Sequence, residues 1–447
     1  MPCQLLVPVE IKAREFDAKI LFSCFAAERG YEVLIGQRQA LYKEVLPVSS
    51  PGILIEHDVT AAHKSTFPEV IKLGHAIVAW DEEGLVQPSS SWYVSRRISP
   101  DVMRMTQSHF AWGREQTRWI AEACPDLASR LVAAGNPRMD LLRPEFATYL
   151  KAEADVYRER YGEYILINSN FNRVNLFHGE RESFIESVAK SAGLSADMST
   201  YYREFIEHSE RTFHAYVAML PAFARRFPDR QIIVRPHPAE DAGPWRKAAE
   251  GLPNLQVIYE GTANGWISGA AALVHSGCTT AIEATVLSVP VIEFAPNDVA
   301  RFVLPLPRQV SRLAISFESL CTMLESILSG TSVGNAITDP NCPLHSQVSG
   351  LQGGFASEAI LDHLAKIKLG QGDFLFKLEK RSRFFLRRLL GSPRTPESSG
   401  VMYARHKFPE TSVADVRKTI EGFQRVSGRF GELRIKKIAS NCFRISQ

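Results

Sequence analysis

Short apolar runs alternate with longer amphipathic segments along most of this chain. In the first part, runs rich in β-branched residues predict strands. Their expected ranges are Gln4–Val9, Tyr31–Gly36, Ile53–Glu56, Ala76–Trp80, Phe110–Gly113 and Leu131–Ala134. Segments with helical spacing lie between them, at Phe16–Arg29, Gln39–Val45, Lys64–Leu73 and Arg114–Cys124. Strands that alternate with helices at this spacing indicate a parallel, doubly wound sheet.

The same alternation starts again near Tyr164. The expected strands are Tyr164–Asn168, Ile232–Val234, Leu255–Tyr259, Ala272–His275, Val289–Phe294 and Ala314–Ser316. The expected helices are Tyr202–Arg226, Gly265–Ala271, Cys278–Ser288 and Ser319–Leu328. We therefore predict an α/β fold with two Rossmann-like domains, over residues 1–160 and 161–345. A C-terminal extension over 346–447 is expected to contain a crossover helix at about 357–368 that returns to the first domain, a basic amphipathic helix and a tail.

Two polar motifs follow strands of the second domain. Arg235 and His237 lie in the segment RPHP, whose two prolines end the preceding strand. Ser276 and Gly277 follow the strand Ala272–His275 and precede a helix, where free backbone N–H groups favour an anion. Because ligands of open α/β sheets bind at the carboxyl ends of the strands, both motifs are expected at one place.

The predicted helix after Ser276 carries further polar groups. Thr279 or Thr280 and Glu283 follow Ser276 at spacings that share one helix face. Hydroxyl groups followed by a carboxylate fit a phosphate and then a ribose. Taken singly, the Ser-Gly pair is also an ordinary N-cap, the histidine a turn residue and Glu283 a solvated carboxylate.

The RPHP segment and the stretch HSGCTTAIEATVLSVPVIEF together resemble the C-terminal half of GT-B glycosyltransferases of bacterial surface polysaccharides. The resemblance is to capsule Kdo transferases, polysialyltransferase-type enzymes and CDP-glycerol glycerophosphotransferases, and it extends over about residues 3–330. It implies two domains facing a cleft, with the N-terminal domain on the acceptor side. It also implies that the C-terminal domain holds the phosphates of a nucleotide donor through the His-Pro motif and the Ser/Gly helix start.

Three adjacent carboxylates, Asp81, Glu82 and Glu83, follow the strand Ala76–Trp80. Their mutual repulsion is expected to raise at least one pKa, as a general acid or base requires. A solvated acidic loop is the alternative interpretation. The resemblance implies a catalytic carboxylate in the first domain, so Glu82 or Glu83 is the favoured candidate and Asp81 the third.

Two further segments contain residues that are expected at the cleft. Arg138 lies in a Gly-Asn-Pro-Arg turn that is similar to the GxPR segment of these transferases, where it would reach the donor phosphate. A salt bridge or cap at the hinge is the alternative role. Asn168, Ser169 and Asn170 end the first strand of the second domain, at a loop that borders the cleft in GT-B enzymes.

Composition restricts the classes of function. The net charge of +3 gives no argument for nucleic acid as a partner. Seven scattered cysteines without a CxxC motif suggest a reducing cytoplasm and no zinc site. The charged residues within Glu10–Arg14 indicate that no signal peptide is present. The same turn lacks the GxGxxG motif of a dinucleotide-binding domain. No apolar run is long enough to predict a transmembrane helix.

The segment 374–390, FLFKLEKRSRFFLRRLL, differs from the rest of the chain. It predicts a basic amphipathic helix rich in Phe and Leu, which suits an anionic membrane surface. A helix packed on the body with a basic outer face is the alternative. Membrane association would suit a cytoplasmic enzyme that acts, on the inner face of the membrane, on a lipid-linked acceptor.

These observations predict a glycosyltransferase that moves a sugar from a nucleotide donor to a glycan or glycolipid acceptor of the bacterial surface, in capsule or lipopolysaccharide assembly. The resemblance favours a CMP-activated acidic sugar such as Kdo. No metal and no cofactor other than the nucleotide-sugar substrate is expected, because no DxD signature is present. A non-hydrolysing sugar-nucleotide epimerase of the same fold and a non-catalytic assembly subunit are the alternatives.

Overall fold

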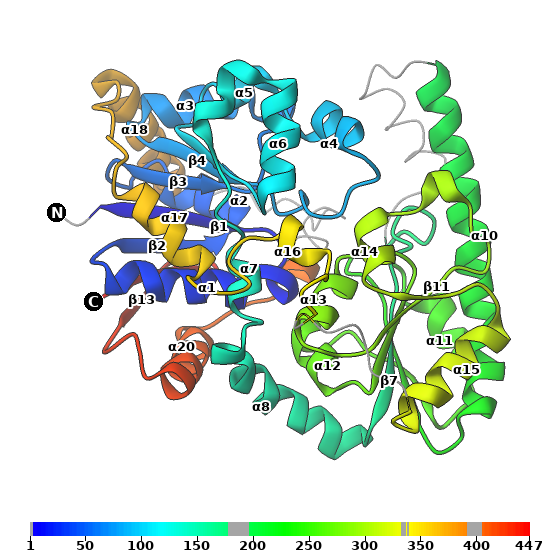
Figure 1. The fold of residues 1–447 in the computed structure, drawn as a ribbon. Coiled ribbons are helices and arrows are strands. Elements are labelled where there is room, and N and C mark those ends of the chain that lie inside the picture. Colours follow the sequence, from blue (N-terminus) through cyan, green and yellow to red (C-terminus); the bar gives the residue numbers. More distant parts are fainter. Residues whose placement is uncertain (1–2, 178–195, 332–336, 338, 391–404) are drawn as a thin grey trace. The chain divides into compact units, whose positions relative to one another are not determined.

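A computed structural model describes residues 3–177, 196–331, 337, 339–390 and 405–447. The chain forms two compact units, Met1–Tyr149 together with Leu344–Gln447, and Leu150–Pro343. Each unit is built on one sheet covered by helices (Figure 1). The predicted α/β class with two Rossmann-like parallel sheets is thereby confirmed.

The first unit contains an eight-stranded sheet in the order β13-β14-β2-β1-β3-β4-β5-β6. Its strands are β1 (Gln4–Val9), β2 (Glu32–Gln37), β3 (Gly52–Glu56), β4 (Ala76–Trp80), β5 (Ser108–Phe110), β6 (Leu131–Val132), β13 (Arg434–Ala439) and β14 (Cys442–Ser446). Its helices are α1 (Lys12–Glu28), α2 (Arg38–Ala40), α3 (Thr66–Lys72), α4 (Ser90–Arg97), α5 (Pro100–Met103), α6 (Arg114–Ala123), α7 (Pro137–Asp140), α16 (Leu344–Gln347), α17 (Ala356–Leu364), α18 (Phe374–Leu390) and α20 (Val413–Ser427). Leu41–Val45 forms a π-helical turn, and Ala61–His63 and Pro125–Arg130 form 3₁₀ turns.

The strands β1 to β6 are parallel to one another, and the apolar runs of β1 to β5 are buried on both faces of the sheet. The helix α1 packs on α7, α17 and α20. A separate cluster of buried side chains joins the strands to α3, α4 and α6 through Phe67, Tyr93 and Ile120. Helices therefore cover both faces, as a doubly wound sheet requires.

The C-terminal hairpin of β13 and β14 extends this sheet at the edge strand β2. The pairing of β14 with β2 is antiparallel and places Cys442 opposite Gly36. A Cβ atom at Gly36 would lie 2.3 Å from the carbonyl oxygen of Asn441. The close approach of the hairpin thus requires glycine in β2.

The second unit contains a six-stranded parallel sheet in the order β12-β11-β10-β7-β8-β9. Its strands are β7 (Tyr164–Asn168), β8 (Gln231–Arg235), β9 (Leu255–Val257), β10 (Ala272–His275), β11 (Val291–Phe294) and β12 (Arg312–Ala314). Its helices are α10 (Ala196–Arg226), α11 (Gly243–Ala249), α12 (Ala263–Gly269), α13 (Thr280–Val286), α14 (Pro305–Gln309) and α15 (Phe317–Leu328), with a 3₁₀ turn at Ala300–Phe302. The boundary between the units lies within α8 (Pro144–Tyr161).

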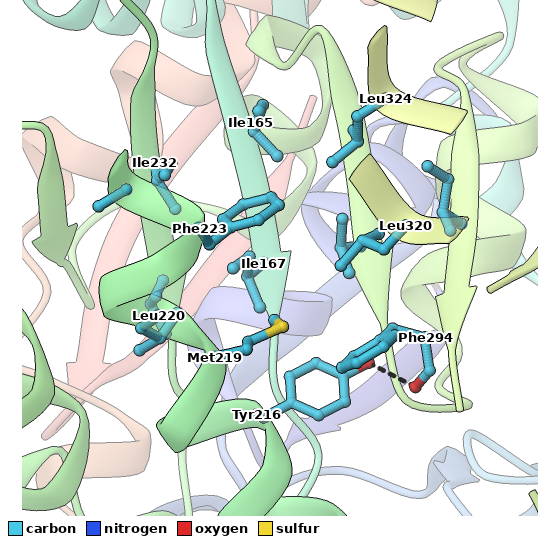
Figure 2. Packing of buried hydrophobic residues seen from close by; sticks show 14 of the residues in the cluster. Ile165, Ile167, Tyr216, Met219, Leu220, Phe223, Ile232, Phe294, Leu320 and Leu324 are labelled. Atoms are coloured by element: carbon cyan, nitrogen blue, oxygen red, sulfur yellow. Dashed lines mark hydrogen bonds between the residues drawn. The ribbon is translucent and has the colours of Figure 1, made fainter. Parts of the chain in front are cut away.

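One core cluster of the second unit fills the space between the sheet and α10, α11 and α15 (Figure 2). Phe223 of α10 packs against Ile165 of β7 and its neighbours, and Leu320 and Leu324 come from α15. The hydroxyl of Tyr216 donates a hydrogen bond of 2.9 Å to the carbonyl oxygen of Phe294, so the buried ring satisfies its polar end.

Several observed ranges differ from the predicted ones. The first helix begins at Lys12 instead of Phe16, and the fifth strand covers Ser108–Phe110 instead of Phe110–Gly113. Residues 344–447 belong to the first compact unit, in which α17, α20 and the hairpin pack on α1 and β2.

Candidate functional site

The order of the strands in the second sheet defines a topological switch point. From β7 the chain continues to β8 and β9 on one side, and it then returns to place β10 on the other side of β7. The connections that follow β7 and β10 therefore leave the carboxyl ends of these strands in opposite directions. Open α/β sheets bind ligands at such a point.

Two buried polar atoms lie at this switch point without a hydrogen-bond partner among the described residues. Asn168 ends β7 opposite His275 of β10, and Ser276 directly follows that strand. The Oδ1 atom of Asn168 and the Oγ atom of Ser276 are both buried and unpartnered. Because buried polar atoms are normally paired, both atoms are available to satisfy a ligand.

The residues after Asn168 tie the neighbouring loops together. Ser169 donates its hydroxyl to Glu240 at 2.8 Å and accepts the backbone N–H of His237 at 3.2 Å. The amide of Asn170 donates to the carbonyl oxygen of Gly277 at 3.2 Å. The three predicted cleft residues are thus brought to the RPHP segment and to the Ser-Gly turn, and two of them already support these loops.

The turn after β10 depends on glycine. Gly277 has a φ angle of +83°, in the region that favours glycine, and its N–H donates to Nδ1 of His275 at 2.9 Å. The helix α13 begins only at Thr280, with Thr279 at its N-cap. Ser276 therefore precedes the helix, and the predicted shared helix face extends only over Thr280 and Glu283.

Two polar side chains of α13, Thr280 and Glu283, were predicted to face a ligand. The hydroxyl of Thr280 lies 2.7 Å from Sγ of Cys278, and Glu283 is buried. Burial in this segment raises the pKa of the Cys278 thiol to about 11, so the thiol is not a nucleophile at neutral pH.

Arg235 and His237 differ in their surroundings. The guanidinium of Arg235 is buried, donates to the carbonyl oxygens of Glu260 and Gly261, and lies 5.7 Å from the ring centroid of Trp266. These contacts hold the 260–261 turn, which the sequence pattern did not indicate. The Nδ1 atom of His237 accepts the N–H of Ala239 at 3.1 Å, so in the neutral ring the proton lies on Nε2.

In the first unit, the three carboxylates after β4 are held by separate cations. Asp81 is buried, and both of its oxygens accept hydrogen bonds from Arg97. Glu83 is half exposed and forms an ion pair with Arg14. Burial raises the pKa of Asp81, whereas the Arg14 guanidinium lowers the pKa of Glu83 to about 2. Mutual repulsion of the three carboxylates is therefore not what shifts these pKa values, because each side chain faces a different partner.

Glu82 differs from the other two carboxylates in having a buried oxygen without a hydrogen-bond partner among the described residues. Its Oε1 atom accepts the indole N–H of Trp80 at 2.7 Å and lies 3.1 Å from Nζ of Lys19. Its Oε2 atom is buried and has no hydrogen-bond partner among the described residues. The carboxylate of Glu82 is thus satisfied on one oxygen only among the described residues.

Arg138 lies in α7, where the side chain of Asn136 accepts its backbone N–H at 3.0 Å. Its guanidinium lies 3.4 Å from the carbonyl oxygen of Glu82 and 5.8 Å from the ring centroid of Trp112. Both contacts belong to the first unit and place Arg138 beside the loop that carries Glu82.

A second polar group of the first unit was not predicted. The first sheet has its own switch point between β1 and β3, and His57 follows β3 there. The Nε2 atom of His57 lies 3.1 Å from Asp58 and 3.6 Å from Glu10, while Nδ1 contacts Glu56. Burial opposes the charged ring, but Glu56 and Asp58 outweigh it, and the pKa of His57 is raised. The sequence IEHD at the end of a predicted strand was the available signal.

The described residues contain neither a candidate metal centre nor a candidate membrane span. None of their His, Cys, Asp and Glu side chains form a group of three or more that could hold a metal ion. Among the helices of the described ranges, none has the length and apolar character needed to cross a membrane.

Comparison with known proteins shows similarity in three dimensions alone. No family model matches the sequence, and no curated protein matches it either. The chain is similar to the wall teichoic acid polymerase TagF, with a TM-score of 0.49 and 10% identity over 81% of this chain and 88% of TagF. It is also similar to a UDP-GlcNAc 2-epimerase from Methanocaldococcus jannaschii in complex with UDP-GlcNAc and UDP, with a TM-score of 0.47 and 12% identity over 82% of this chain and 99% of that one. The similarity to the UDP-GlcNAc 2-epimerase from Neisseria meningitidis has a TM-score of 0.45 and 13% identity, over 82% of this chain and 100% of that one.

Proposed function

We propose that this protein is a GT-B glycosyltransferase that uses a nucleotide-sugar donor in the assembly of a bacterial surface glycan. The observation that carries the proposal is the pair of unpartnered buried atoms, Asn168 Oδ1 and Ser276 Oγ, at the switch point of the second sheet. A hydroxyl and an amide at this place suit the phosphate and ribose of a nucleotide.

In the proposed reaction, the loops after β7, β8 and β10 hold the donor's phosphates. The hydroxyl of Ser276 and the Nε2–H of His237 donate hydrogen bonds to the phosphate oxygens, and Gly277 lets the backbone turn close to them. Thr279, Thr280 and Glu283 lie on the side of the ribose. These donors stabilise the negative charge that develops on the leaving phosphate as the bond from the anomeric carbon to the phosphate oxygen breaks.

An acceptor hydroxyl forms the new glycosidic bond, and its proton passes to a carboxylate of the first unit. We assign this role to Glu82, because its Oε2 atom is unpartnered whereas Asp81 and Glu83 are held by arginines. Arg138, beside Glu82, holds the loop that carries the base. A CMP-activated acidic sugar such as Kdo is the donor favoured by the sequence resemblance, and a surface polysaccharide or its lipid-linked precursor is the acceptor.

The experiment is an incubation of purified protein with CMP-, CDP- and UDP-linked sugars, with and without a glycolipid acceptor. Released nucleotide is measured by anion-exchange chromatography and the sugar products by mass spectrometry. Transfer predicts nucleotide release that depends on the acceptor. We expect kcat/KM to fall about tenfold in Ser276→Ala, which corresponds to one lost hydrogen bond of about 1.4 kcal/mol.

Two results would contradict the proposal. A sugar nucleotide of changed stereochemistry formed from donor alone would identify an epimerase. No turnover of any donor, with the nucleotides still bound, would identify a non-catalytic assembly subunit.

A further inference from the structure

The helix α18 contacts the first unit through one side. Phe376 packs against the core cluster beside α3, with Nζ of Lys72 5.5 Å from its ring centroid. On the same side, Nζ of Lys380 lies 2.8 Å from Glu69 of α3. Among the positions of α18 whose side chains are described, Phe376, Lys377, Lys380 and Phe384 are half-buried. Their spacing defines the side of the helix that faces the body.

Apart from Phe376 and Phe384, the large apolar side chains of α18 are on the other side. Seven of the eleven exposed large apolar side chains of the described residues belong to this one helix. They are Phe374 (75% exposed), Leu375 (74%), Leu378 (53%), Phe385 (53%), Leu386 (56%), Leu389 (84%) and Leu390 (75%). A helix on a protein surface normally buries its apolar side, whereas α18 directs most of its apolar side chains away from the body.

These seven positions form one continuous stripe. At about 100° per residue they fall within an arc of roughly 160° on the helix surface. The polar members of that arc are Ser382 and Glu379, and Glu379 forms an ion pair of 2.7 Å with Arg383. A contiguous exposed apolar stripe of this width marks a surface that binds a partner or a membrane.

Charge indicates what covers the stripe. The segment contains six Lys or Arg residues and one Glu. Arg381 and Arg383 are exposed and lie on either flank of the stripe by helical spacing. A second copy of this chain would bring the same positive flanks together, which is unfavourable. An anionic lipid surface offers both an apolar interior and negative headgroups.

We propose that α18 is a membrane-docking helix that lies in the surface of an anionic lipid bilayer. Its stripe from Phe374 to Leu390 enters the acyl boundary, and Arg381 and Arg383 contact the lipid phosphates. The contacts of Phe376 and Lys380 hold the helix on the first unit, so the whole protein is attached through this face.

Sedimentation with sucrose-loaded vesicles tests this proposal on the full-length chain. The vesicles are either phosphatidylglycerol and phosphatidylcholine in equal amounts, or phosphatidylcholine alone. We expect the protein to sediment with the anionic vesicles and to remain largely in the supernatant with the neutral ones. The triple variant Phe385→Ser, Leu386→Ser, Leu389→Ser is expected to lose at least tenfold in apparent affinity for the anionic vesicles.

The matched control replaces exposed apolar residues outside α18, in the triple variant Ile71→Ser, Val156→Ser, Ile315→Ser. These side chains are 41%, 60% and 60% exposed, and their replacement is expected to leave vesicle binding unchanged. Equal vesicle binding of the wild type and the α18 variant would overturn the proposal. So would a wild-type dimer that the α18 variant abolishes, with no vesicle binding, because a second copy would then cover the stripe. Vesicle binding is measured without donor or acceptor, so its outcome is independent of the transferase reaction.

Discussion

His57 forms an ion pair with Asp58 at the carboxyl end of β3, with 3.1 Å between Nε2 and Oδ2. The other oxygen of Asp58 lies 3.0 Å from His63, and the other nitrogen of His57 contacts Glu56. The imidazole is thus held between two carboxylates at the switch point of the first sheet. Such an arrangement stabilises the protonated ring.

The first prediction concerns the pH dependence of stability through His57. Its folded-state pKa is raised, so its contribution is fully present below the unfolded pKa of about 6.5 and is lost as pH rises through the folded pKa. We expect His57→Gln to lower the free energy of unfolding by about 1.5–3 kcal/mol at pH 6. The difference from wild type should shrink by pH 9, as measured by urea unfolding at both values. A difference that is the same at pH 6 and pH 9 would contradict the ion pair.

The second prediction concerns the buried cation beside the candidate base. Lys19 is buried between Glu15 and Glu82 and donates to the carbonyl oxygen of Pro8 at 2.8 Å. Lys19→Met would leave the buried carboxylate of Glu82 without its cation and that of Glu15 with only Arg14, at 3.7 Å. We expect a loss of about 3–5 kcal/mol in the free energy of unfolding, measured with urea.

A matched control for Lys19 is Lys151→Met. The Nζ atom of Lys151 lies 2.8 Å from Asp155, but both side chains are largely exposed. Exposed pairs contribute about 0–1 kcal/mol. Similar losses in the two variants would mean that the environment of Lys19 is not the buried one described above.

The third prediction concerns the anchor of α17. Asp140 is buried, and its two oxygens accept the backbone N–H groups of Ala356 and Ser357 at 2.8 and 2.7 Å. The N-cap residue of α17, Phe355, has no side-chain cap, so Asp140 takes that role from a distant part of the chain. We expect Asp140→Ala to cost about 1–3 kcal/mol in the free energy of unfolding.

The exposed residue Asp126, which pairs with Arg104 at 2.9 Å, is the control for Asp140. Asp126→Ala should change stability by no more than about 1 kcal/mol. If Asp140→Ala is equally neutral, the cap does not hold the C-terminal segment in place.

The buried strands could be predicted from the sequence, in some cases to the residue. Gln4–Val9, Ala76–Trp80, Tyr164–Asn168 and Ala272–His275 are continuous apolar runs, which parallel strands require when both faces are covered. The C-terminal hairpin was not predicted. Its outer strand, Arg434–Ala439, carries exposed lysines, and its turn places Asn441 at a φ of +51°. The hairpin is positioned by pairing with β2, which is distant in sequence, so its own residues show no continuous apolar run.

Of the candidate site, the sequence predicted those residues that directly follow a buried strand. The rule that polar residues at carboxyl ends converge placed Asn168, Ser276 and Glu82 at their strand ends. It did not indicate that Arg235 binds carbonyl oxygens of a turn 25 residues later, because that contact depends on where α12 begins. It also left out His57, although the same rule applied to β3 would have included it.

The measurement that tests the central claim most directly is a thermal-shift panel of CMP, CDP, UMP, UDP, GDP and ADP on wild type and Ser276→Ala. The Oγ atom of Ser276 makes no hydrogen bond among the described residues, so its removal should leave the stability of the free protein unchanged. A nucleotide at a hundredfold excess over Kd should add about 2.7 kcal/mol of stability to wild type. Ser311→Ala is the control, because its hydroxyl pairs with His275 at 2.8 Å and its loss should lower the stability of the free protein.

We predict a shift with at least one pyrimidine nucleotide in wild type, reduced by about tenfold in affinity in Ser276→Ala and retained in Ser311→Ala. No shift with any nucleotide, or a shift that Ser276→Ala leaves unchanged, would contradict a nucleotide site between β7 and β10.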